Sequence, residues 1–327
     1  MRTTAALITS AGLLLGLTAC STPGSTVEPT CDVTSGNASE AIAATGAAGD
    51  SLDDLSFPTP LVASSTQVSI LEDGAGESVS MLTPMFANFA VYNGRTGEVI
   101  QPYGPIGVDQ STGEPQLITL QALTGIAGFQ EAMQCATEGS RVAVAVPPED
   151  AFGETGSSQL GVGADDTLVF VADVIETFPS RATGDPRPAR AGFPSVVTDH
   201  DGVPGITIPP SAAPDEYRET LLREGDGVEV SEGDTVMVHY TGVLWDSGEV
   251  FDSSWTRGTP VSFPAQEGSA EQQGVVKGFA DALIGAQVGD QVLAVLPPDV
   301  AYGDEASGSI PAGSTLVFVI DVLGVTD

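Results

Sequence analysis

The sequence predicts a chain of two α+β units, each built from twisted antiparallel sheet and one short helix. A set of short motifs occurs twice in the same order, about 150 residues apart. Between the motifs, apolar residues alternate along short runs bounded by Gly, Asp and Pro, which is typical of strands. The 39 glycines and 23 prolines make up about a fifth of the 327 residues, which favours turns and short strands over long helices.

The composition excludes some classes of protein. There are 44 acidic side chains against 10 Lys and Arg, so the formal net charge is −34. Because binding to phosphates needs a basic patch, nucleic acid is not an expected partner. Only 17% of the residues are charged and 41% are apolar, whereas a disordered acidic tail has the opposite balance. The chain therefore has enough apolar residues for real cores.

The first residues have the pattern of a secretory signal. Within residues 1–19, one cation precedes an apolar stretch at Ala11–Leu17, and small residues follow. The end of this segment, Leu17-Thr18-Ala19-Cys20, resembles the bacterial lipobox, in which the cysteine receives a diacylglycerol. We therefore expect a lipoprotein signal peptide over 1–19, lipidation of Cys20, and a protein anchored at the extracytoplasmic face of the cell membrane. The alternative is an ordinary signal peptide cut near Ala19.

Two cysteines remain after that cleavage, Cys31 and Cys135. An even number in an exported protein is compatible with one disulfide, and two free buried thiols are the alternative. His200 and His239 are the only histidines, and no pair of cysteines has CxxC spacing. We therefore predict no metal site and no cofactor.

The internal repeat rests on four pairs of segments. They are Gly97-Glu98-Val99 with Gly248-Glu249-Val250, Ala127-Gly128-Phe129 with Lys277-Gly278-Phe279, Pro147–Gly153 with Pro297–Gly303, and Thr167–Phe170 with Thr315–Phe318. The offsets lie between 148 and 151 residues, which indicates two homologous units of about 120 residues each. A solenoid is excluded because its repeats are much shorter.

The domain boundaries follow from the composition. Residues 20–54 are rich in Ser, Thr, Ala and Gly without apolar periodicity, so we predict a flexible tether. Residues 55–179 form the first unit. Residues 180–194 contain three arginines and three prolines and are interpreted as an interdomain linker, and residues 195–327 form the second unit.

Three strands and one helix are predicted in the second unit. Thr235–Tyr240, Gln291–Leu296 and Leu316–Val322 are rich in β-branched and apolar residues, which is typical of strands. Three apolar residues share one face of a helix near Lys277–Ile284.

Five motifs of the second unit, in their order and spacing, point to a known family. They are Val238-His239-Tyr240-Thr241-Gly242, Phe251-Asp252-Ser253-Ser254, Val275-Val276-Lys277-Gly278-Phe279, Ala301-Tyr302-Gly303, and Ile310-Pro311 followed by Thr315–Phe318. This part of the chain resembles the FKBP-type peptidyl-prolyl cis-trans isomerases (immunophilins), strongly over about residues 220–327 and weakly over about 69–178. The resemblance implies two FKBP-like units, each a half-barrel of antiparallel sheet wrapped over one short helix, in a tandem-domain bacterial lipoprotein.

The reaction of that family needs neither a nucleophile nor a metal. The barrier is rotation about a C–N bond with partial double-bond character, about 18–20 kcal/mol. The planar amide is more polar than the twisted transition state, so a dry pocket destabilises the amide relative to the transition state. Hydrogen bonds that are made only to the twisted form stabilise it further.

The resemblance assigns roles to side chains of the second unit. The implied catalytic residues are Tyr240, Asp252 and Tyr302. The implied substrate-binding residues of the proline pocket are Phe251, Val261, Phe263, Val275, Val276, Phe279, Ile310 and Phe318. Asp252 would accept a hydrogen bond from Tyr240 and face the substrate carbonyl. The Tyr302 hydroxyl and the Val276 N–H would each donate to a substrate carbonyl.

Structural interpretations of the same residues remain open. The apolar set could be plain core, Asp252 could cap a turn, and Tyr302 could be a satisfied hydroxyl at the end of a strand. Two positions depart from the family pattern: Phe279 stands where many members have Trp, and Val261 replaces a common aromatic residue. Neither change removes a charged group, so we expect activity with altered substrate preference.

The first unit departs further. Its residues at the positions of Tyr240, Phe251, Asp252 and Tyr302 are Phe89, Ile100, Gln101 and Phe152. Both hydroxyls and the carboxylate are missing, and an apolar set with Ile126, Phe129 and Phe170 remains. We expect a degenerate FKBP-like unit that is structural or binds peptides.

These observations predict a peptidyl-prolyl cis-trans isomerase that assists the folding of exported proteins, with activity mainly in the second unit. The expected partners are unfolded or newly exported proteins with X-Pro bonds, and macrolide immunosuppressants are candidate ligands. The alternatives are a noncatalytic chaperone that holds proline-containing segments and a passive surface lipoprotein.

Overall fold

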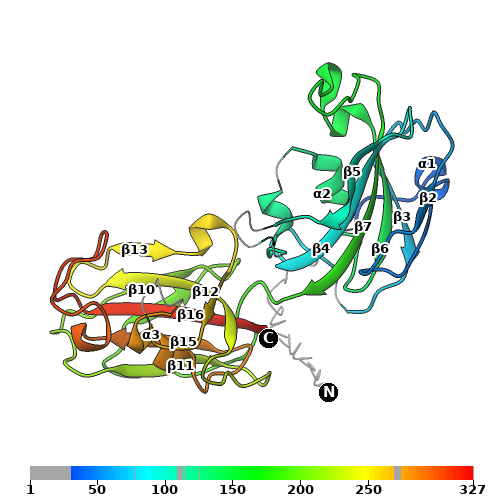
Figure 1. The fold of residues 1–327 in the computed structure, drawn as a ribbon. Coiled ribbons are helices and arrows are strands. Elements are labelled where there is room, and N and C mark those ends of the chain that lie inside the picture. Colours follow the sequence, from blue (N-terminus) through cyan, green and yellow to red (C-terminus); the bar gives the residue numbers. More distant parts are fainter. Residues whose placement is uncertain are drawn as a thin grey trace, which may run out of the picture.

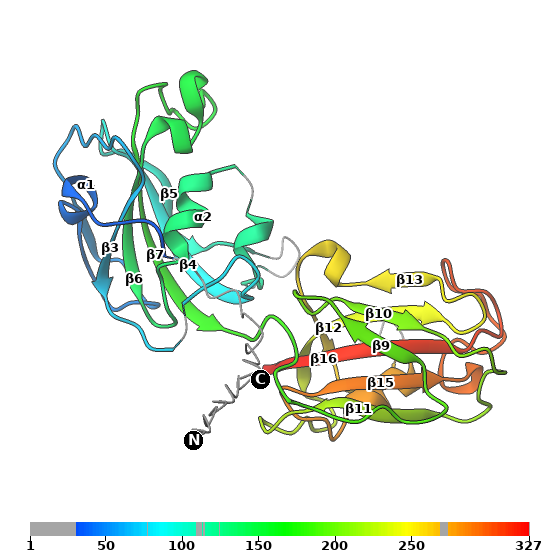
Figure 2. The same ribbon diagram turned by 180° about the vertical axis from the view of Figure 1, so that it is seen from behind.

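A computed structural model shows two units, each with its own sheet (Figures 1 and 2). The structure describes residues 31–326, apart from 77, 109–112, 114, 124 and 269–273. The predicted signal peptide, Cys20 and the first part of the predicted tether therefore lie outside the described residues. No helix in the described part of the chain is both long and apolar enough to cross a membrane.

The first unit is a five-stranded antiparallel sheet with the order β3-β6-β7-β4-β5. Its strands are β3 (Gln67–Glu72), β4 (Met85–Asn93), β5 (Val99–Pro105), β6 (Arg141–Val146) and β7 (Leu168–Thr177). The helix α2 (Ala127–Met133) lies across one face of this sheet (Figure 1). Short 3-10 turns complete the unit: η1 (Leu120–Ala122), η2 (Pro148–Asp150) and η3 (Gly153–Thr155).

The second unit repeats this plan with additional strands. Its sheet has the order β13-β12-β16-β15-β11-β8, and β14 also pairs with β12. The strands are β8 (Asp185–Pro186), β11 (Arg218–Glu224), β12 (Thr235–Leu244), β13 (Val250–Ser253), β14 (Val261–Pro264), β15 (Gln291–Leu296) and β16 (Leu316–Thr326). The helix is α3 (Lys277–Leu283), and the 3-10 turns are η4 (Trp255–Arg257) and η6 (Pro298–Val300). The predicted α+β class, the three strands and the helix are confirmed.

Each sheet is buried on both faces because successive side chains of a strand point to opposite sides. In β6, Val142, Val144 and Val146 pack toward α2, whereas Ala143 and Ala145 belong to a separate apolar cluster on the outer face. β15 divides its apolar residues between two clusters in the same way. A strand buried on both faces explains why these runs are almost continuously apolar.

The segment that precedes each unit covers the outer face of its sheet. In the first unit this segment contains α1 (Asn37–Glu40), β1 (Ala43–Thr45) and β2 (Asp54–Ser56), and its apolar residues complete the outer cluster. The expectation of a flexible tether over 20–54 is therefore wrong for residues 31–54. The apolar residues of this segment do not recur with the period of a strand or a helix, because they pack onto the outer face of a sheet whose strands come later in the chain.

In the second unit the covering segment includes β9 (Ser195–Thr198) and β10 (Pro204–Thr207), which lie on the face opposite α3 (Figure 2). The predicted linker 180–194 does connect the units, but it is not a free spacer. The Gly184 N–H donates to the Gly289 carbonyl, and β8 pairs with β11.

Two aspartates at corresponding positions bind backbone N–H groups of the segments that precede the two sheets. On β7, Asp173 forms a buried ion pair with Arg141, 2.7 Å apart, and accepts a hydrogen bond from Gly49 N. The Arg141 guanidinium also donates to the carbonyls of Gly46 and Ser51. The first covering segment is thus tied to the sheet by charge as well as by apolar packing.

On β16, Asp321 stands where the first unit has Asp173, and its strand partner is Gln291 in place of Arg141. Its carboxylate accepts hydrogen bonds from Ala182 N and from Gln291 Nε2, each at 2.8 Å. Among the described residues, no cation forms an ion pair with this buried carboxylate.

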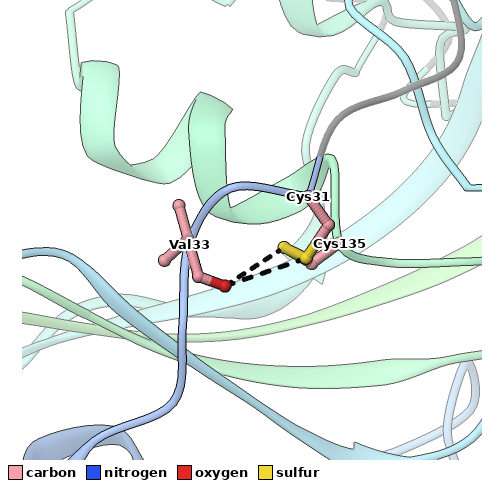
Figure 3. The surroundings of a disulfide bond; sticks show 3 residues. All are labelled: Cys31, Val33 and Cys135. Atoms are coloured by element: carbon pink, nitrogen blue, oxygen red, sulfur yellow. Dashed lines mark hydrogen bonds between the residues drawn. A yellow bond between two sulfur atoms is a disulfide. The ribbon is translucent and has the colours of Figure 1, made fainter.

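A disulfide joins Cys31 to Cys135, with a Cα–Cα distance of 4.6 Å (Figure 3). Both sulfurs lie 3.7 Å from the carbonyl oxygen of Val33. These are contacts rather than hydrogen bonds, because disulfide sulfurs carry no proton. Of the two possibilities that the sequence leaves open, the structure has the disulfide, which pins the start of the covering segment beside the end of α2.

The two units meet in a small apolar cluster, which we call the junction cluster. Phe178, directly after β7, packs with Met237 and Leu323 of the second unit and with Phe86 and Leu117 of the first. Met237 and Leu323 are each only 1% exposed. The rings of Phe86 and Phe178 meet edge to face, with their centroids 6.0 Å apart. The units are therefore in contact and are not separated by a free linker.

Candidate active site

The apolar residues that the resemblance assigns to the proline pocket lie in one cluster between α3 and the inner face of the second sheet. Tyr240, Phe279, Ile310 and Phe318 are buried in it. The remaining assigned residues are partly buried against it: Phe251, Val261, Phe263, Val275 and Val276. Partly exposed apolar side chains on a buried base are what an apolar ligand site requires.

Phe279, on α3, is the centre of an aromatic group. Its ring meets those of Tyr240, Phe263 and Phe318 edge to face, with centroids 5.9, 5.4 and 5.1 Å away. Edge-to-face pairs are favourable because the positive edge of one ring contacts the negative face of the other. The floor of the site is therefore rigid and contains no indole N–H.

Gly242, on β12, allows this packing. A Cβ at this position would lie 2.5 Å from a ring atom of Phe251 and 2.8 Å from one of Phe318. No carbon atom can be accommodated at such distances, so the close packing of these two rings requires glycine. The sequence motif contains Gly242, but only the structure shows what it contacts.

Asp252 is the polar centre of the site. Its Oδ2 accepts a short hydrogen bond from the Tyr240 hydroxyl, as the resemblance implies, and its Oδ1 accepts one of 2.6 Å from Arg257 Nη1. Burial alone would raise the pKa of Asp252, but the hydrogen bonds from Tyr240 and Arg257 and the charge of Arg257 outweigh it, so the pKa is lowered. Asp252 is therefore ionised at neutral pH.

Arg257 is a site residue that the sequence reasoning missed. Besides Asp252, its guanidinium donates to the Tyr240 hydroxyl at 3.1 Å, and it lies 5.8 Å from the centroid of that ring. Burial and the hydrogen bond to Asp252 raise the pKa of Tyr240 to about 12, so its hydroxyl keeps its proton. The signal was present in the sequence, since Arg257 follows Asp252 by five residues in a chain with only 10 cations.

Two hydrogen-bond donors that the resemblance assigns to the site have no partner among the described residues. The Tyr302 side chain follows η6, is 39% exposed, and its hydroxyl has no partner among the described residues. The N–H of Val276, the N-cap of α3, likewise has no partner in the part of the chain that the structure describes. Both groups are free to bind a peptide carbonyl.

Behind Tyr240, on the outer face of the sheet, His239 stacks on Trp255 with ring centroids 3.9 Å apart. His239 Nδ1 and Ser254 Oγ are hydrogen-bonded at 2.8 Å, and Ser254 Oγ also accepts from Tyr240 N. Burial, with a smaller contribution from Arg257, lowers the pKa of His239 to about 4, so the ring is neutral at neutral pH. It fixes the turn after Asp252 and does not reach the apolar cluster.

The first unit has the same apolar base without the polar groups. Phe129 stacks on Phe170 with centroids 4.6 Å apart and lies 6.2 Å from Phe89. Its Val91 pairs with Gln101 just as Gly242 pairs with Asp252, which supports the alignment made from sequence.

The first unit also carries a compensating pair of changes. Val91 replaces Gly242, and the smaller Ile100 replaces Phe251.

No group of three or more potential metal ligands occurs among the described residues of either unit.

The fold and this site define a class of protein with two half-barrel units in tandem. One unit has an apolar base with the hydrogen-bonded residues Tyr240, Asp252 and Arg257 at its edge. The family described as "FKBP-type peptidyl-prolyl cis-trans isomerase" matches residues 95–175 and 227–323, together more than half of the chain. The chain belongs to this family of isomerases, and it contains the family unit twice.

Curated relatives agree with this assignment. A "Probable FK506-binding protein" of Corynebacterium glutamicum is 38% identical over 120 residues, covering 37% of this chain and 96% of the relative. An "FK506-binding protein" of Streptomyces anulatus is 37% identical over 124 residues, again covering 37% and 96%.

Solved structures are similar over different lengths. The three FKBP domains of wheat FKBP73 cover 80% of this chain and 94% of that one, at 20% identity and a TM-score of 0.34. FkpA from Escherichia coli covers 40% of this chain and 51% of that one, at 33% identity and a TM-score of 0.30.

Proposed function

We propose that the isomerase activity lies in the second unit. The observation that carries this proposal is the group formed by Asp252, Tyr240 and Arg257 at the edge of an aromatic base. The Tyr302 hydroxyl and the Val276 N–H, which have no partner among the described residues, would complete the site. A prolyl ring would enter the apolar cluster, and the free donors would bind the peptide carbonyls on either side.

The rate enhancement would come from differential binding. Rotation about the C–N bond breaks amide resonance and reduces the charge on the amide oxygen, so transfer to an apolar site costs less for the twisted state than for the planar one. Hydrogen bonds from the Tyr302 hydroxyl and the Val276 N–H would favour the twisted conformer if the peptide carbonyls reach both donors only in that conformer. Each tenfold of rate corresponds to about 1.4 kcal/mol of such differential binding.

The test is a protease-coupled prolyl-peptide assay on the full chain with paired substitutions. We expect Asp252→Ala and Tyr302→Phe together to lower the rate about ten- to a hundredfold, about 1.4–2.7 kcal/mol. Gln101→Ala and Phe152→Leu, at the corresponding first-unit positions, are the matched controls and should keep the wild-type rate. Wild-type rates in both second-unit variants would contradict the proposal. Retained binding of a proline-containing peptide by a chain without isomerase activity would favour a noncatalytic chaperone instead.

We also propose that this isomerase is exported and lipid-anchored through Cys20 at the extracytoplasmic face of the cell membrane. Its substrates there would be newly exported or unfolded proteins with X-Pro bonds, and macrolides of the immunosuppressant type would compete for the same apolar site. The disulfide supports export, because such bonds persist in oxidising compartments.

A further inference from the structure

One residue of the first unit reaches the turn of the second unit that follows Asp252. The Thr119 hydroxyl donates a hydrogen bond of 3.2 Å to the carbonyl oxygen of Gly258. Thr119 caps η1, and the same hydroxyl accepts from the N–H of Ala122, the last residue of that turn. Thr119 is only 1% exposed. A buried hydroxyl bonded in this way holds two segments, 139 residues apart in sequence, at a defined distance.

The turn that it contacts is held at its other end by the second unit itself. η4 begins at Trp255, whose ring stacks on His239, and it closes at Gly258, which has a left-handed φ of 74°. Gly202 lies close to that ring, since a Cβ there would be 3.1 Å from Trp255 Cη2. The four residues from 255 to 258 are therefore fixed at the start by packing and at the end by Thr119.

Between these two ends lies Arg257, which contacts both Asp252 and Tyr240. Its side chain is 45% exposed and that of Asp252 is 41% exposed. An ion pair with this much exposure contributes little by itself, because solvent screens it and two side chains lose conformational freedom. Its geometry therefore depends on how firmly the backbone of η4 is held.

The junction cluster explains why Thr119 is in place. Leu117, two residues before it, packs in that cluster with Phe178 and Met237. Apolar packing between the units thus presents the Thr119 hydroxyl to Gly258, and the packing lies outside the isomerase site.

We propose that the first unit positions the active site of the second: docking of Thr119 on the Gly258 carbonyl fixes η4, and Arg257 then holds Asp252 and Tyr240 in their productive arrangement. Thr119 is on this view a positioning residue. The inference rests on the proposed assignment of activity to the second unit. It gives the degenerate unit a role that does not require it to bind substrate.

The experiment uses the full chain and four variants in the prolyl-peptide assay. Thr119→Val keeps the shape and removes the hydroxyl, and we expect kcat to fall about two- to tenfold with KM nearly unchanged, because the apolar base is untouched. Thr119→Ser restores the hydroxyl and should restore kcat. Thr96→Val is the control, since Thr96 is an exposed first-unit threonine and its hydroxyl, among the described residues, bonds to the side chain and the backbone N–H of Glu98 alone.

The fourth variant, Arg257→Ala, tests the route. If Thr119 acts through Arg257, kcat falls in Arg257→Ala, and adding Thr119→Val lowers it little further. Wild-type kcat in Thr119→Val, or an equal additional loss in the double variant, would overturn the inference. Wild-type rates in Asp252→Ala would instead overturn the underlying assignment to the second unit, so the two failures are distinguishable.

Discussion

At the scale of single residues, Gly242 decides whether the aromatic base can form. Its missing Cβ leaves the space that Phe251 and Phe318 occupy. The first unit has Val91 at this position and the smaller Ile100 at the position of Phe251. The two differences therefore match sterically, because the larger side chain at one position accompanies the smaller one at the other.

We therefore expect Gly242→Ala to displace Phe251 and to lower kcat/KM about tenfold or more, since about 1.4 kcal/mol of lost substrate contact has this effect. The prolyl-peptide assay measures the loss, and a companion Phe251→Leu substitution should recover part of it by making room for the new methyl group. Wild-type activity in Gly242→Ala would mean that the ring packing is not required.

The buried Asp321 is a second decisive residue. Burial, only partly offset by its hydrogen bonds from Ala182 and Gln291, raises its pKa to about 6 from the ordinary value of 3.8. The folded state therefore binds the proton more tightly than the unfolded state. This tighter proton binding stabilises the folded second unit. The stabilisation is fully present below pH 3.8 and is lost as the pH rises through about 6.

From this shift we expect Asp321→Asn to stabilise the second unit at pH 8, by at most about 3 kcal/mol, and to give no gain at pH 4. Thermal unfolding at the two pH values measures the difference. The variant must be compared with the wild type at each pH, because His239 also makes the free energy of unfolding depend on pH. Its pKa is lowered to about 4, so its contribution to stability falls as the pH falls, which is opposite to the contribution of Asp321. Asp173→Asn is the matched control, and it should destabilise the first unit because Asp173 is paired with Arg141. A gain from Asp321→Asn that is as large at pH 4 as at pH 8 would contradict the assignment.

At the scale of elements, a buried aspartate on the last strand of each sheet binds the backbone of the segment that precedes that sheet. The two units solve this problem differently: Arg141 neutralises Asp173 in the first, whereas Gln291 only hydrogen-bonds Asp321 in the second. Arg141 also donates hydrogen bonds to backbone carbonyls of the first covering segment. Removing Arg141 should therefore destabilise the first unit more than removing Gln291 destabilises the second.

We accordingly expect Arg141→Gln, which copies the second unit, to destabilise the first unit by about 3–5 kcal/mol, the usual cost of removing one partner of a buried ion pair. Hydrogen exchange resolved along the chain is the measurement, because both tryptophans lie in the second unit. Protection should fall in β6 and in residues 43–56 and stay unchanged in β15. Equal loss of protection in both units, or none in residues 43–56, would show that the ion pair does not hold the covering segment.

At the scale of the whole molecule, the disulfide limits how far the first unit could lie from a membrane if Cys20 is lipidated as proposed. A lipid anchor at Cys20 would lie eleven residues before Cys31, so its reach would be at most about 40 Å even at full extension. A net charge of −34 would repel anionic headgroups, and two acyl chains on Cys20 would still anchor the chain.

The corresponding prediction is that wild-type protein partitions with membranes and resists extraction by salt, whereas Cys20→Ala is released to the soluble fraction. Fractionation with a salt wash measures this, and Cys31→Ser with Cys135→Ser is the control that should remain membrane-bound. A Cys20→Ala protein that is as firmly bound as the wild type would contradict lipidation at this residue.

The sequence by itself determined the repeat, the α+β class, the three predicted strands and the helix, whereas the apolar site residues were implied by the family resemblance. These features are encoded locally: alternation marks a strand, helical spacing marks α3, and the motif around Asp252 has a specific spacing. The structure places all the assigned apolar residues in one cluster, and their roles in catalysis remain predictions.

Only the tertiary structure decided the contact of Arg257 with Asp252, the pairing of the cysteines, the covering segments and the junction between the units. Each of these depends on which distant residues meet. Residues 31–54 have no periodicity because their side chains fit a surface made by β6 and β7, and the Thr119 hydroxyl acquires its partner only when the apolar junction closes. A pattern within one segment carries no information about such contacts, because the free energy that selects them comes from burial and hydrogen bonding between segments that the chain brings together only on folding.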